Sequence, residues 1–484
     1  MLVDGKRRGI DVIIPIYNAY DDLKVCLESI KKYVDLTLDR VILINDCSPD
    51  ERIKPYIDQI GKEKGFLALH NEKNLGFSGT VNRGIAYTER DVILLNSDTI
   101  VTAGWIDKIV RCADSDESIA TVTPFSNSAT ICSIPVYCQD NLIPDGFTVD
   151  QYAEIVERSS LRRYPEISVA VGFCMFIKRQ VINEVGFFDQ ETYQRGYGEE
   201  NDFCWLASEL GYIHVLCDDT FVYHKGTISF QSEEKKQLIA EQENILRRRY
   251  SKLVRANEIF CATDKNWMLR KNIELYAKAD PAKKNILYVL HLDFHHKCKD
   301  RVGGTQFHVE DLVQGSLSEY NTYVIARDGA YLRLTLYTEN ESVEMQFLVD
   351  DARPYATLHD RKFEKIFEMI LSAFHIDLVH IHHVQGLSLD IFHIAHKRKI
   401  PLTVTLHDFY MICPTIKMLD CTGKVCIGRE EKTDCQECLW KQCAVSKKHK
   451  NYIQVWRKKH REALSMCNII FTPSESAKKI VLSY

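Results

Sequence analysis

A short stretch in the first quarter of the chain, VILLNSDTIV from Val92 to Val101, joins an apolar run to a carboxylate. Four successive apolar residues are typical of a buried strand, and Asn96-Ser97-Asp98 follows them. Open α/β sheets bind ligands beyond the carboxyl ends of their strands. A carboxylate there suits a hard cation such as Mg²⁺, and that cation suits a phosphate. The alternative is an Asx turn that closes the strand.

The elements around this stretch predict a parallel α/β sheet with a nucleotide-type crevice. Apolar runs and helical spacing alternate, and polar turns follow the strand ends. The predicted strands are Asp11–Pro15, Val41–Ile44, Leu67–His70 and Val92–Leu95. The first strand is followed by no Gly-rich phosphate loop, which argues against a dinucleotide oxidoreductase, a P-loop NTPase and a sugar-nucleotide pyrophosphorylase.

The length and charge of the chain restrict its class. A chain of 484 residues predicts two or three domains. A formal net charge of −5 argues against general nucleic-acid binding. Apolar runs fall short of the ~20 residues that span a bilayer, and no signal peptide is evident. We therefore expect a cytoplasmic protein, with peripheral association with the inner face of the cell membrane left open.

Six motifs in the first half occur in a familiar order. They are DVIIPIYN, INDCSPD, NLGFSGTVNRGI, LLNSDT, VGFCMFIKR and GYGEENDFCWLASELGY. Together they closely resemble the inverting family-2 glycosyltransferases with a GT-A fold, particularly bacterial polysaccharide and lipopolysaccharide members. The resemblance covers about residues 10–250. It implies sugar transfer from a nucleotide-diphosphate sugar of the UDP or dTDP type to a growing polysaccharide or lipid-linked glycan.

The resemblance implies a donor site at the strand ends. The residues that it places near the donor are Pro15, Tyr17, Asn18, Asp46, Arg83, Asn96, Ser97 and Asp98. Asp46 would bind the base or ribose, although a turn or helix cap also explains an aspartate there. Arg83 would reach the diphosphate, and a solvated surface charge is the equal alternative.

The resemblance also implies a divalent cation, Mg²⁺ or Mn²⁺. Asp98 would be the principal ligand of a DxD motif, and the family places a histidine at the position of His224 as a further ligand. The sequence departs from the motif because Asn96 stands at its first aspartate. An amide oxygen carries less charge, so the departure concerns the strength of metal binding and not its location.

Three carboxylates open a predicted helix after Gly198. Acidic residues there complement the helix dipole, which is their simplest explanation. In the family an acidic pair at this point supplies the general base. By position this is Glu200, with Asp202 as the alternative and Glu199 as a structural or acceptor contact. Residues 112–168 are expected to form an irregular insertion that shapes the acceptor pocket.

The second half of the chain predicts a further α/β unit. GGTQFHVEDL, DLVHIHH, IPLTVTLHDFYMICP and FTPSESAKK resemble the Rossmann-like N-terminal half of a family-4 glycosyltransferase with a GT-B fold. We expect a GT-A domain at 1–250, a helical linker at 251–284 and the GT-B half at 285–484.

The resemblance places Gly303, Gly304 and His407 at the cleft of this second domain. A helix-start turn and a strand-end histidine are the alternatives. The nucleotide-binding half of such enzymes would follow Tyr484. We therefore expect either a truncated domain or a docking or acceptor-binding module, inactive in this chain alone.

Six of the 17 cysteines lie between Cys413 and Cys443. Cys435 and Cys438 have the CxxC spacing of a metal knuckle, and a structural Zn²⁺ prefers four thiolates. The candidate set is Cys421, Cys426, Cys435 and Cys438. The alternative is a reduced loop with several buried thiols.

Two other functions remain open for the chain. A non-catalytic glycan-binding or assembly subunit could keep glycosyltransferase folds. A nucleotidyltransferase would release pyrophosphate, whereas sugar transfer releases a nucleoside diphosphate.

Overall fold

The computed structural model describes residues 7–193, 198–226, 233–292, 303–349, 356–426, 434–449 and 451–484. The chain divides into two compact units, Met1–Glu274 and Leu275–Tyr484. Both are mixed α/β, which confirms the predicted fold class. Among the described residues, no helix is long and apolar enough to cross a membrane.

The first unit is built on an eight-stranded sheet with the order β3-β2-β1-β4-β8-β6-β9-β7. The strands are β1 (Asp11–Ile16), β2 (Arg40–Asn45), β3 (Phe66–His70), β4 (Val92–Leu95), β6 (Ile119–Phe125), β7 (Glu166–Ile167), β8 (Cys174–Ile177) and β9 (Ile213–Phe221). Strands β1 to β4 run parallel, and β8 is antiparallel to β4 and β6. The carboxyl ends of β1, β2 and β4 therefore meet at one edge, as the sequence predicted.

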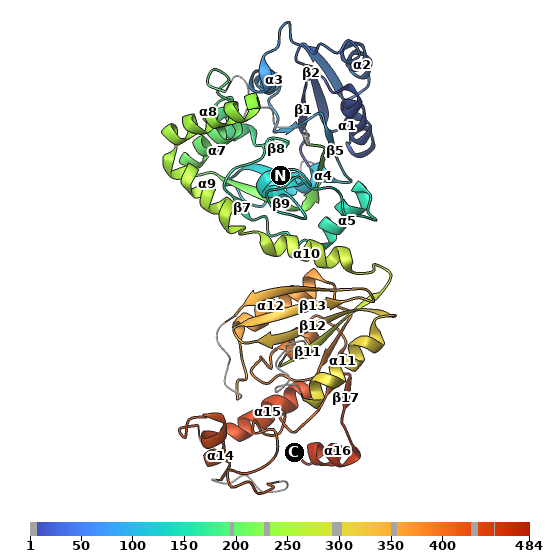
Figure 1. Ribbon diagram of the computed structural model, residues 1–484, viewed down its shortest axis with the longest axis vertical. Helices are drawn as coiled ribbons and strands as arrows, with labels where there is room; N and C mark the ends of the chain where they lie inside the picture. The colour runs from blue at the N-terminus through green and yellow to red at the C-terminus, as the bar shows by residue number, and fades with distance from the viewer. Residues whose placement is uncertain are drawn as a thin grey trace. The chain divides into compact units, whose positions relative to one another are not determined.

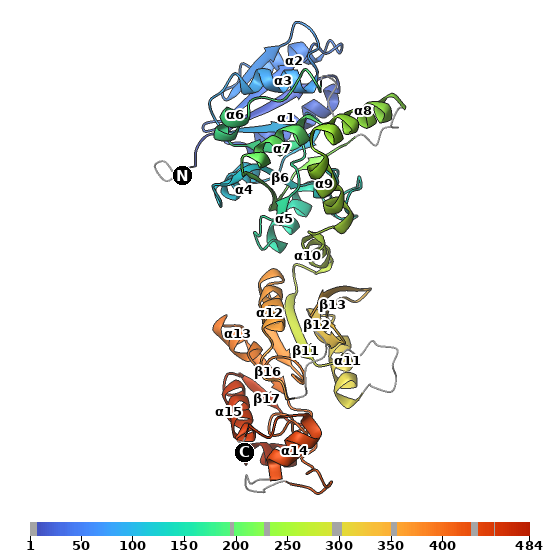
Figure 2. The ribbon, with the colours of Figure 1, turned by 90° about the vertical axis from the view of Figure 1, so that its left-hand side faces the viewer.

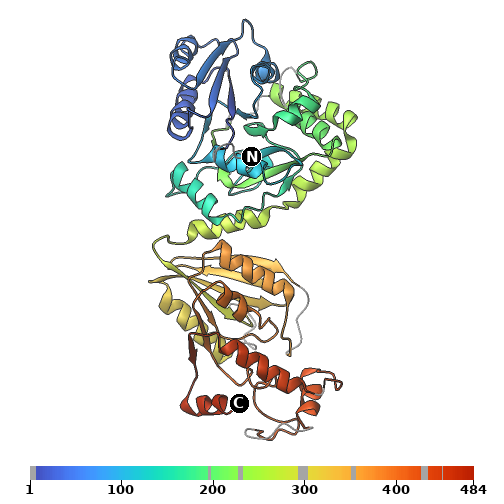
Figure 3. The same ribbon diagram turned by 180° about the vertical axis from the view of Figure 1, so that it is seen from behind.

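Helices cover both faces of this sheet. They are α1 (Tyr20–Tyr33), α2 (Ile53–Ile60), α3 (Gly76–Ile85), α4 (Trp105–Ala113), α5 (Val149–Ser159), α6 (Arg179–Val185), α7 (Glu199–Glu209), α8 (Glu233–Arg249), α9 (Ser251–Thr263) and α10 (Trp267–Lys278). Figures 1 and 3 show α1 and α2 on one side of β1 and β2, with α3 on the other. A Cβ on Gly84 would lie 2.6 Å from Cγ2 of Ile13, so α3 packs on β1 only because this residue is glycine.

The expectation of an irregular insertion at 112–168 was wrong for two elements. The segment Ile119–Phe125 forms β6, whose seven residues are all buried between β8 and β9. Val149–Ser159 forms α5, which begins with a capping box of Thr148 and Gln151. The prolines of this region lie between these elements or at a strand end, and they concealed the two periodic segments.

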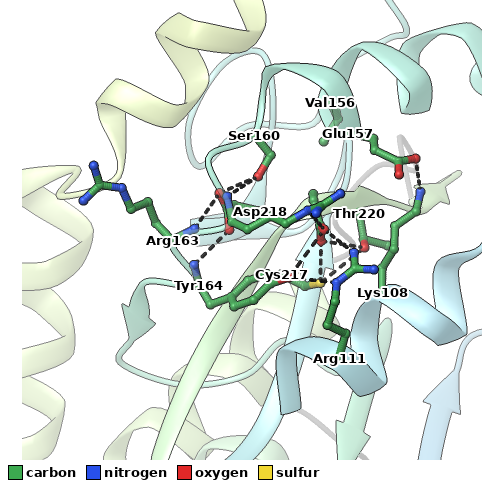
Figure 4. Close-up of polar contacts among 12 residues, drawn as sticks. Lys108, Arg111, Val156, Glu157, Ser160, Arg163, Tyr164, Cys217, Asp218 and Thr220 are labelled. Atoms are coloured by element: carbon green, nitrogen blue, oxygen red, sulfur yellow. Dashed lines mark hydrogen bonds and ion pairs between the residues drawn. The ribbon is translucent and has the colours of Figure 1, made fainter. Parts of the chain in front are cut away.

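Buried aspartates fix the loop after α5 to β9 (Figure 4). Asp218 accepts hydrogen bonds from Ser160 Oγ at 2.7 Å and from the Tyr164 amide at 2.9 Å. Its neighbour Asp219 pairs with Arg111 of α4 at 2.6 Å and with Arg162 at 3.2 Å. These contacts satisfy two carboxylates in the core and hold α4 and the loop in place.

The second unit contains a seven-stranded sheet with the order β14-β13-β12-β11-β15-β16-β17. The strands are β11 (Lys284–Leu290), β12 (Tyr320–Asp328), β13 (Tyr331–Tyr337), β14 (Ser342–Leu348), β15 (Leu378–Ile381), β16 (Leu402–Thr405) and β17 (Ile469–Phe471). Strand β13 forms antiparallel pairs with β12 and β14.

The helices of the second unit lie between its strands in the chain or follow the last of them. They are α11 (Gly304–Ser316), α12 (Arg361–Ala373), α13 (Ile391–Lys397), α14 (Asp434–Cys443), α15 (Tyr452–Leu464) and α16 (Glu475–Leu482). Figure 2 shows α12 and α13 on one side of the central strands and α11 on the other. The parallel strands β11, β15 and β16 form the centre, as in a Rossmann-like domain.

Candidate active site

A cavity of about 320 Å³ opens at the carboxyl ends of β1, β2 and β4. Its lining residues are Pro15, Ile16, Tyr17, Asp46, Asn74, Gly76, Phe77, Thr80, Asn96, Ser97 and Asp98. Six of the predicted donor-site residues are thus brought together. The side chain of Tyr17 is half exposed, at 52%, and offers an aromatic face on which a base could stack.

Asp46 holds the start of α3 in this cavity. Its carboxylate accepts hydrogen bonds from the amides of Leu75 at 2.7 Å and Gly76 at 3.0 Å, and from Asn71 Nδ2 at 2.7 Å. A negative charge at a helix N-terminus is favourable. Asp46 therefore caps α3 and lines the cavity at the same time.

Two predicted donor residues lie outside the cavity lining. Arg83 donates through Nη1 to the His70 carbonyl at 2.6 Å and also contacts Oδ1 of Asn71. Its guanidinium thus supports the end of β3. Asn18 has a left-handed backbone with φ of 60°, and its amide donates to Ser48 Oγ at 3.1 Å. Phe77 and Thr80 line the cavity but were not singled out, although both lie in the NLGFSGTVNRGI motif.

A second, small sheet brings His224 to Asp98. Strands β5 (Thr99–Ile100) and β10 (Tyr223–His224) pair antiparallel, with His224 opposite Thr99. The amide of Lys225 donates to the carbonyl of Asp98 at 3.0 Å. As a result, His224 Nε2 lies 3.4 Å from Asp98 Oδ1 and 3.5 Å from Asn96 Nδ2.

The ring of His224 is oriented by groups on its far side. Nδ1 lies 2.7 Å from the Ser128 carbonyl oxygen, so Nδ1 carries the hydrogen and donates it. The ring stacks on Phe173 with centroids 5.2 Å apart. A histidine whose Nδ1–H is bound to a carbonyl presents Nε2 as a metal ligand.

The electrostatics of this pair favour a charged carboxylate. Burial by itself raises the pKa of Asp98, but the hydrogen bond and charge of His224 outweigh it and leave the pKa below its ordinary value. Burial lowers the pKa of His224, and Asp98 outweighs that effect and leaves the pKa above the usual range.

The donor set of Asp98, His224 and Asn96 fits a divalent cation. A rotated Asn96 amide would present Oδ1 in place of Nδ2. Because a metal requires neutral imidazole, its binding competes with the proton on His224. Lys225 points elsewhere, since its Nζ pairs with Asp22 at 2.6 Å.

The three carboxylates at the start of α7 have different environments. Asp202 is buried, and it accepts hydrogen bonds from the Tyr193 hydroxyl at 3.2 Å and from Arg249 Nη1 at 3.1 Å. Glu199 is also buried, and Glu200 is partly exposed. The carboxylate of Asp202 is therefore already bound by the guanidinium of Arg249 and the hydroxyl of Tyr193.

Burial, and then the charge of Glu200, raises the pKa of Glu199 to about 8. Burial also raises the pKa of Glu200. A carboxylate with a raised pKa is a better general base near neutral pH.

The backbone before α7 is constrained. Gly198 has φ of 151°, and a Cβ there would lie 2.9 Å from the ring of Tyr193. The segment that precedes it is tied to α3, since Asn82 bonds both the amide of Phe188 at 3.0 Å and its carbonyl at 2.8 Å. The same helix α3 thus contributes to the donor cavity and anchors the chain that leads to the acidic residues. Gly196 of this motif lies outside the described residues.

Three of the four cysteines proposed to bind Zn²⁺ line one small cavity. Cys426, Cys435 and Cys438 line it, and the amide of Cys421 donates to Sγ of Cys438 at 2.9 Å. Within the described residues, these sulfur atoms do not form a group of three ligand atoms within 4.8 Å of one another.

In the second unit, Gly303 is the N-cap residue of α11 and Gly304 begins the helix. His407 follows β16 and lines a different cavity, of about 410 Å³.

Two family models match the chain. Residues 11–186 match glycosyl transferase family 2. Residues 302–484 match glycosyltransferase family 4. Both agree with the resemblances seen in the motifs.

Curated relatives align with the first unit or part of it. Glycosyltransferase GlyG of Streptococcus pneumoniae serotype 4 is 26% identical over 237 residues, which are 46% of this chain and 73% of that protein. The uncharacterized glycosyltransferase YibD of Escherichia coli K12 is 30% identical over 22% of this chain and 31% of its own length. The chain thus spans about a third of the latter relative.

Solved structures resemble this chain with lower sequence identity than these relatives do. A mannosyltransferase from Pyrobaculum calidifontis, in complex with GDP-Man and Mn²⁺, has a TM-score of 0.38 and 12% identity over 55% of this chain and 74% of that chain. GalNAc-T7 with UDP, GalNAc and Mn²⁺ has a TM-score of 0.39 and 14% identity over 72% of this chain and 68% of that chain. Similarity at this level assigns no ligand or residue role to this chain.

Proposed function

We propose that this chain, which joins a glycosyl transferase family 2 domain to a glycosyltransferase family 4 domain, transfers a sugar with inversion from a nucleotide-diphosphate sugar. The acceptor is a growing polysaccharide or a lipid-linked glycan, and the donor is of the UDP or dTDP type. One observation carries the proposal. His224 Nε2 lies 3.4 Å from Asp98 Oδ1, beside a cavity lined by Asp46 and Tyr17.

The cavity supports binding of a nucleoside diphosphate. Tyr17 offers a stacking surface for the base, and Asp46 offers a carboxylate oxygen to a ribose hydroxyl. Asp98 and His224, with Asn96, would hold Mg²⁺ or Mn²⁺. When bound, such a cation neutralises charge on a nucleoside diphosphate leaving group.

The residues of α7 support the transfer step. An acceptor hydroxyl is a weak nucleophile, and Glu200 takes its proton as the oxygen attacks the anomeric carbon. The new C–O bond forms on the face opposite the leaving group, and the bond from the anomeric carbon to the phosphate oxygen breaks. The electron pair leaves with the nucleoside diphosphate, and the anomeric centre is inverted. Asp202 is held by Arg249 and Tyr193, which favours Glu200 as the base.

The main alternative is a non-catalytic glycan-binding or assembly subunit. A subunit that had lost catalysis would not need a carboxylate paired with a histidine whose other nitrogen is oriented by a carbonyl. The second unit is proposed to transfer no sugar by itself.

The test is release of nucleoside diphosphate by the full chain, measured with a panel of nucleotide sugars and Mg²⁺ or Mn²⁺. We expect Asp98→Ala and Glu200→Gln each to lower the rate by ~100-fold or more, the contribution typical of a general base or of lost charge stabilisation. The rate should also fall as pH drops through the raised pKa of His224, because a protonated imidazole cannot bind a metal.

Exposed acidic residues provide matched controls. Glu89→Gln and Glu209→Gln should keep the wild-type rate, since both side chains are exposed and lie outside the proposed site. Unchanged release by both site variants would show that the site is assigned wrongly. Release of pyrophosphate would indicate a nucleotidyltransferase, and no release with any nucleotide sugar would favour the non-catalytic subunit. The anomeric configuration of the product, read by NMR, tests inversion.

A further inference from the structure

The second unit gathers histidines at the carboxyl ends of its central parallel strands. They come from the ends of β11, β15 and β16 and from α11, and they are His291, His308, His380, His382, His383 and His407. Parallel strands bring such residues to one edge of the sheet. The family-2 site of the first unit does not involve any of them.

Three of these side chains form a compact group of nitrogen ligands. One ring nitrogen from each of His308, His382 and His407 lies within 4.8 Å of the other two. Nδ1 of His382 lies 3.1 Å from Nε2 of His407. The ring centroid of His308 is 5.2 Å from that of His407 and 5.8 Å from that of His382.

These separations suit one tetrahedral ion. Zn²⁺ binds imidazole nitrogen at ~2.0–2.1 Å, so two such ligands at a tetrahedral angle lie about 3.3 Å apart. The pair from His382 and His407 already has nearly this spacing. His308 starts from the exposed surface of α11, where a rotamer change can bring it closer.

Two neighbouring histidines, His380 and His383, have ordinary hydrogen-bond partners. His383 Nε2 lies 3.0 Å from Asp408 Oδ2, and His380 Nε2 lies 2.8 Å from Thr405 Oγ1. Nε2 of His382 is buried and has no hydrogen-bond partner among the described residues. The hydrogen of a neutral His382 ring can be placed on this Nε2, which leaves Nδ1, the nitrogen that faces His407, unprotonated and able to bind a metal.

The trio is also free of the charge that would repel a cation. Burial, followed by the charges of neighbouring histidines, lowers the pKa of His407 to about 4. Burial lowers the pKa of His382 well below its usual range. Neutral imidazole is the form that binds metals.

A cavity of about 410 Å³ adjoins the group. His308 and His407 line it together with His380, Phe471 and Thr472. Three protein ligands leave the fourth position of a tetrahedral ion open, as in catalytic zinc centres. A ligand in this cavity could occupy that position.

We propose that His308, His382 and His407 bind a Zn²⁺ ion whose fourth position faces this cavity. A set of imidazoles alone favours Zn²⁺ over the hard cations Mg²⁺ and Mn²⁺. The site is therefore distinct in chemistry from the one proposed at Asp98, and it does not depend on the proposed sugar transfer.

The test uses the full chain, stripped of metal by a chelator and kept reduced. Zn²⁺ is titrated against a chromophoric chelator, and Co²⁺ is then used as a spectroscopic probe. We expect His308→Gln and His407→Gln each to weaken binding at one site by ~10-fold or more. His393→Gln is the matched control, because this histidine is exposed on α13 and outside the group.

The variants separate this site from other metal sites in the chain. Asp98→Ala should keep the Zn²⁺ site. The Co²⁺ complex should show d–d bands without the thiolate charge-transfer absorption that bound cysteines would add. His308→Gln replaces an exposed side chain, so circular dichroism should show an unchanged fold. Wild-type affinity and stoichiometry in both histidine variants, or a Co²⁺ spectrum with thiolate ligands only, would overturn the proposal.

Discussion

At the start of α7, burial and neighbouring groups give each carboxylate its own pKa and hydrogen-bond partners. Glu199, Glu200 and Asp202 are neighbours in sequence, but their surroundings differ. Arg249 and the hydroxyl of Tyr193 bind Asp202, whereas burial raises the pKa of the two glutamates. The general base of the proposed reaction is therefore selected by its surroundings. Carboxylates in the first turn of one helix can therefore serve separate purposes.

Glu199 should make folding stability depend on pH. Its folded pKa of about 8 lies above the ordinary value of 4.5, so stability is lost as pH rises through that window. Glu199→Gln removes the ionisable group, and we expect the variant to lose less stability between pH 5 and pH 8 than the wild type. Urea unfolding at both pH values measures the difference.

The exposed Glu209→Gln variant on the same helix is the control for this effect. It should follow the wild-type dependence on pH. If Glu199→Gln lost as much stability between pH 5 and pH 8 as the wild type, Glu199 would be ionised in the folded protein.

At the scale of elements, α3 connects the two parts of the proposed site. Its N-terminal residues line the donor cavity, and Asn82 anchors the chain before α7. The carboxylate of Asp46 fixes the start of this helix through the amides of Leu75 and Gly76. A change in the cap should therefore affect stability and donor binding together.

Asp46→Ala tests this connection. The variant leaves two helix amides and Asn71 without their acceptor, and we expect a loss of ~1–3 kcal/mol in the free energy of unfolding. Binding of nucleoside diphosphate, measured by calorimetry, should weaken as well. Glu72→Ala, an exposed residue just before α3, is the control and should change neither quantity. Unchanged stability in Asp46→Ala would show that the cap contributes little.

At the scale of the whole molecule, each unit has a core of its own. The first packs around β1, β2, β4 and β6, and the second packs around β11 and β12. A domain with a separate hydrophobic core is expected to unfold cooperatively by itself. Damage to one core should then spare the chemistry of the other unit.

Phe367→Ala tests that independence, because Phe367 is fully buried on α12. Such a truncation costs ~3–5 kcal/mol, and calorimetry should show one unfolding transition lowered. Release of nucleoside diphosphate by the first unit should stay at the wild-type rate below that transition. Phe307→Ala, at a side chain 57% exposed, is the control. A parallel loss of activity in Phe367→Ala would show that the two units depend on each other.

Much of the fold could be predicted because strand and helix formation depend on local patterns. The apolar runs of β1, β2, β3 and β4 marked these strands within two residues of their observed ends. Strand β6 and helix α5 were missed, since both lie among the prolines and turn residues of 112–168. Their places depend on neighbouring strands and packing that the local pattern does not contain.

The sequence by itself determined which residues could do chemistry and at which strand ends they stand, because those facts are local. Only the tertiary structure decided which of them meet. The pairing of β5 with β10 brings His224 to Asp98, and the salt bridge of Arg249 engages Asp202. The convergence of β15, β16 and α11 brings three histidines together. Pairing and burial arise from contacts between segments far apart in the chain, and these contacts set the charges and pKa values on which function depends.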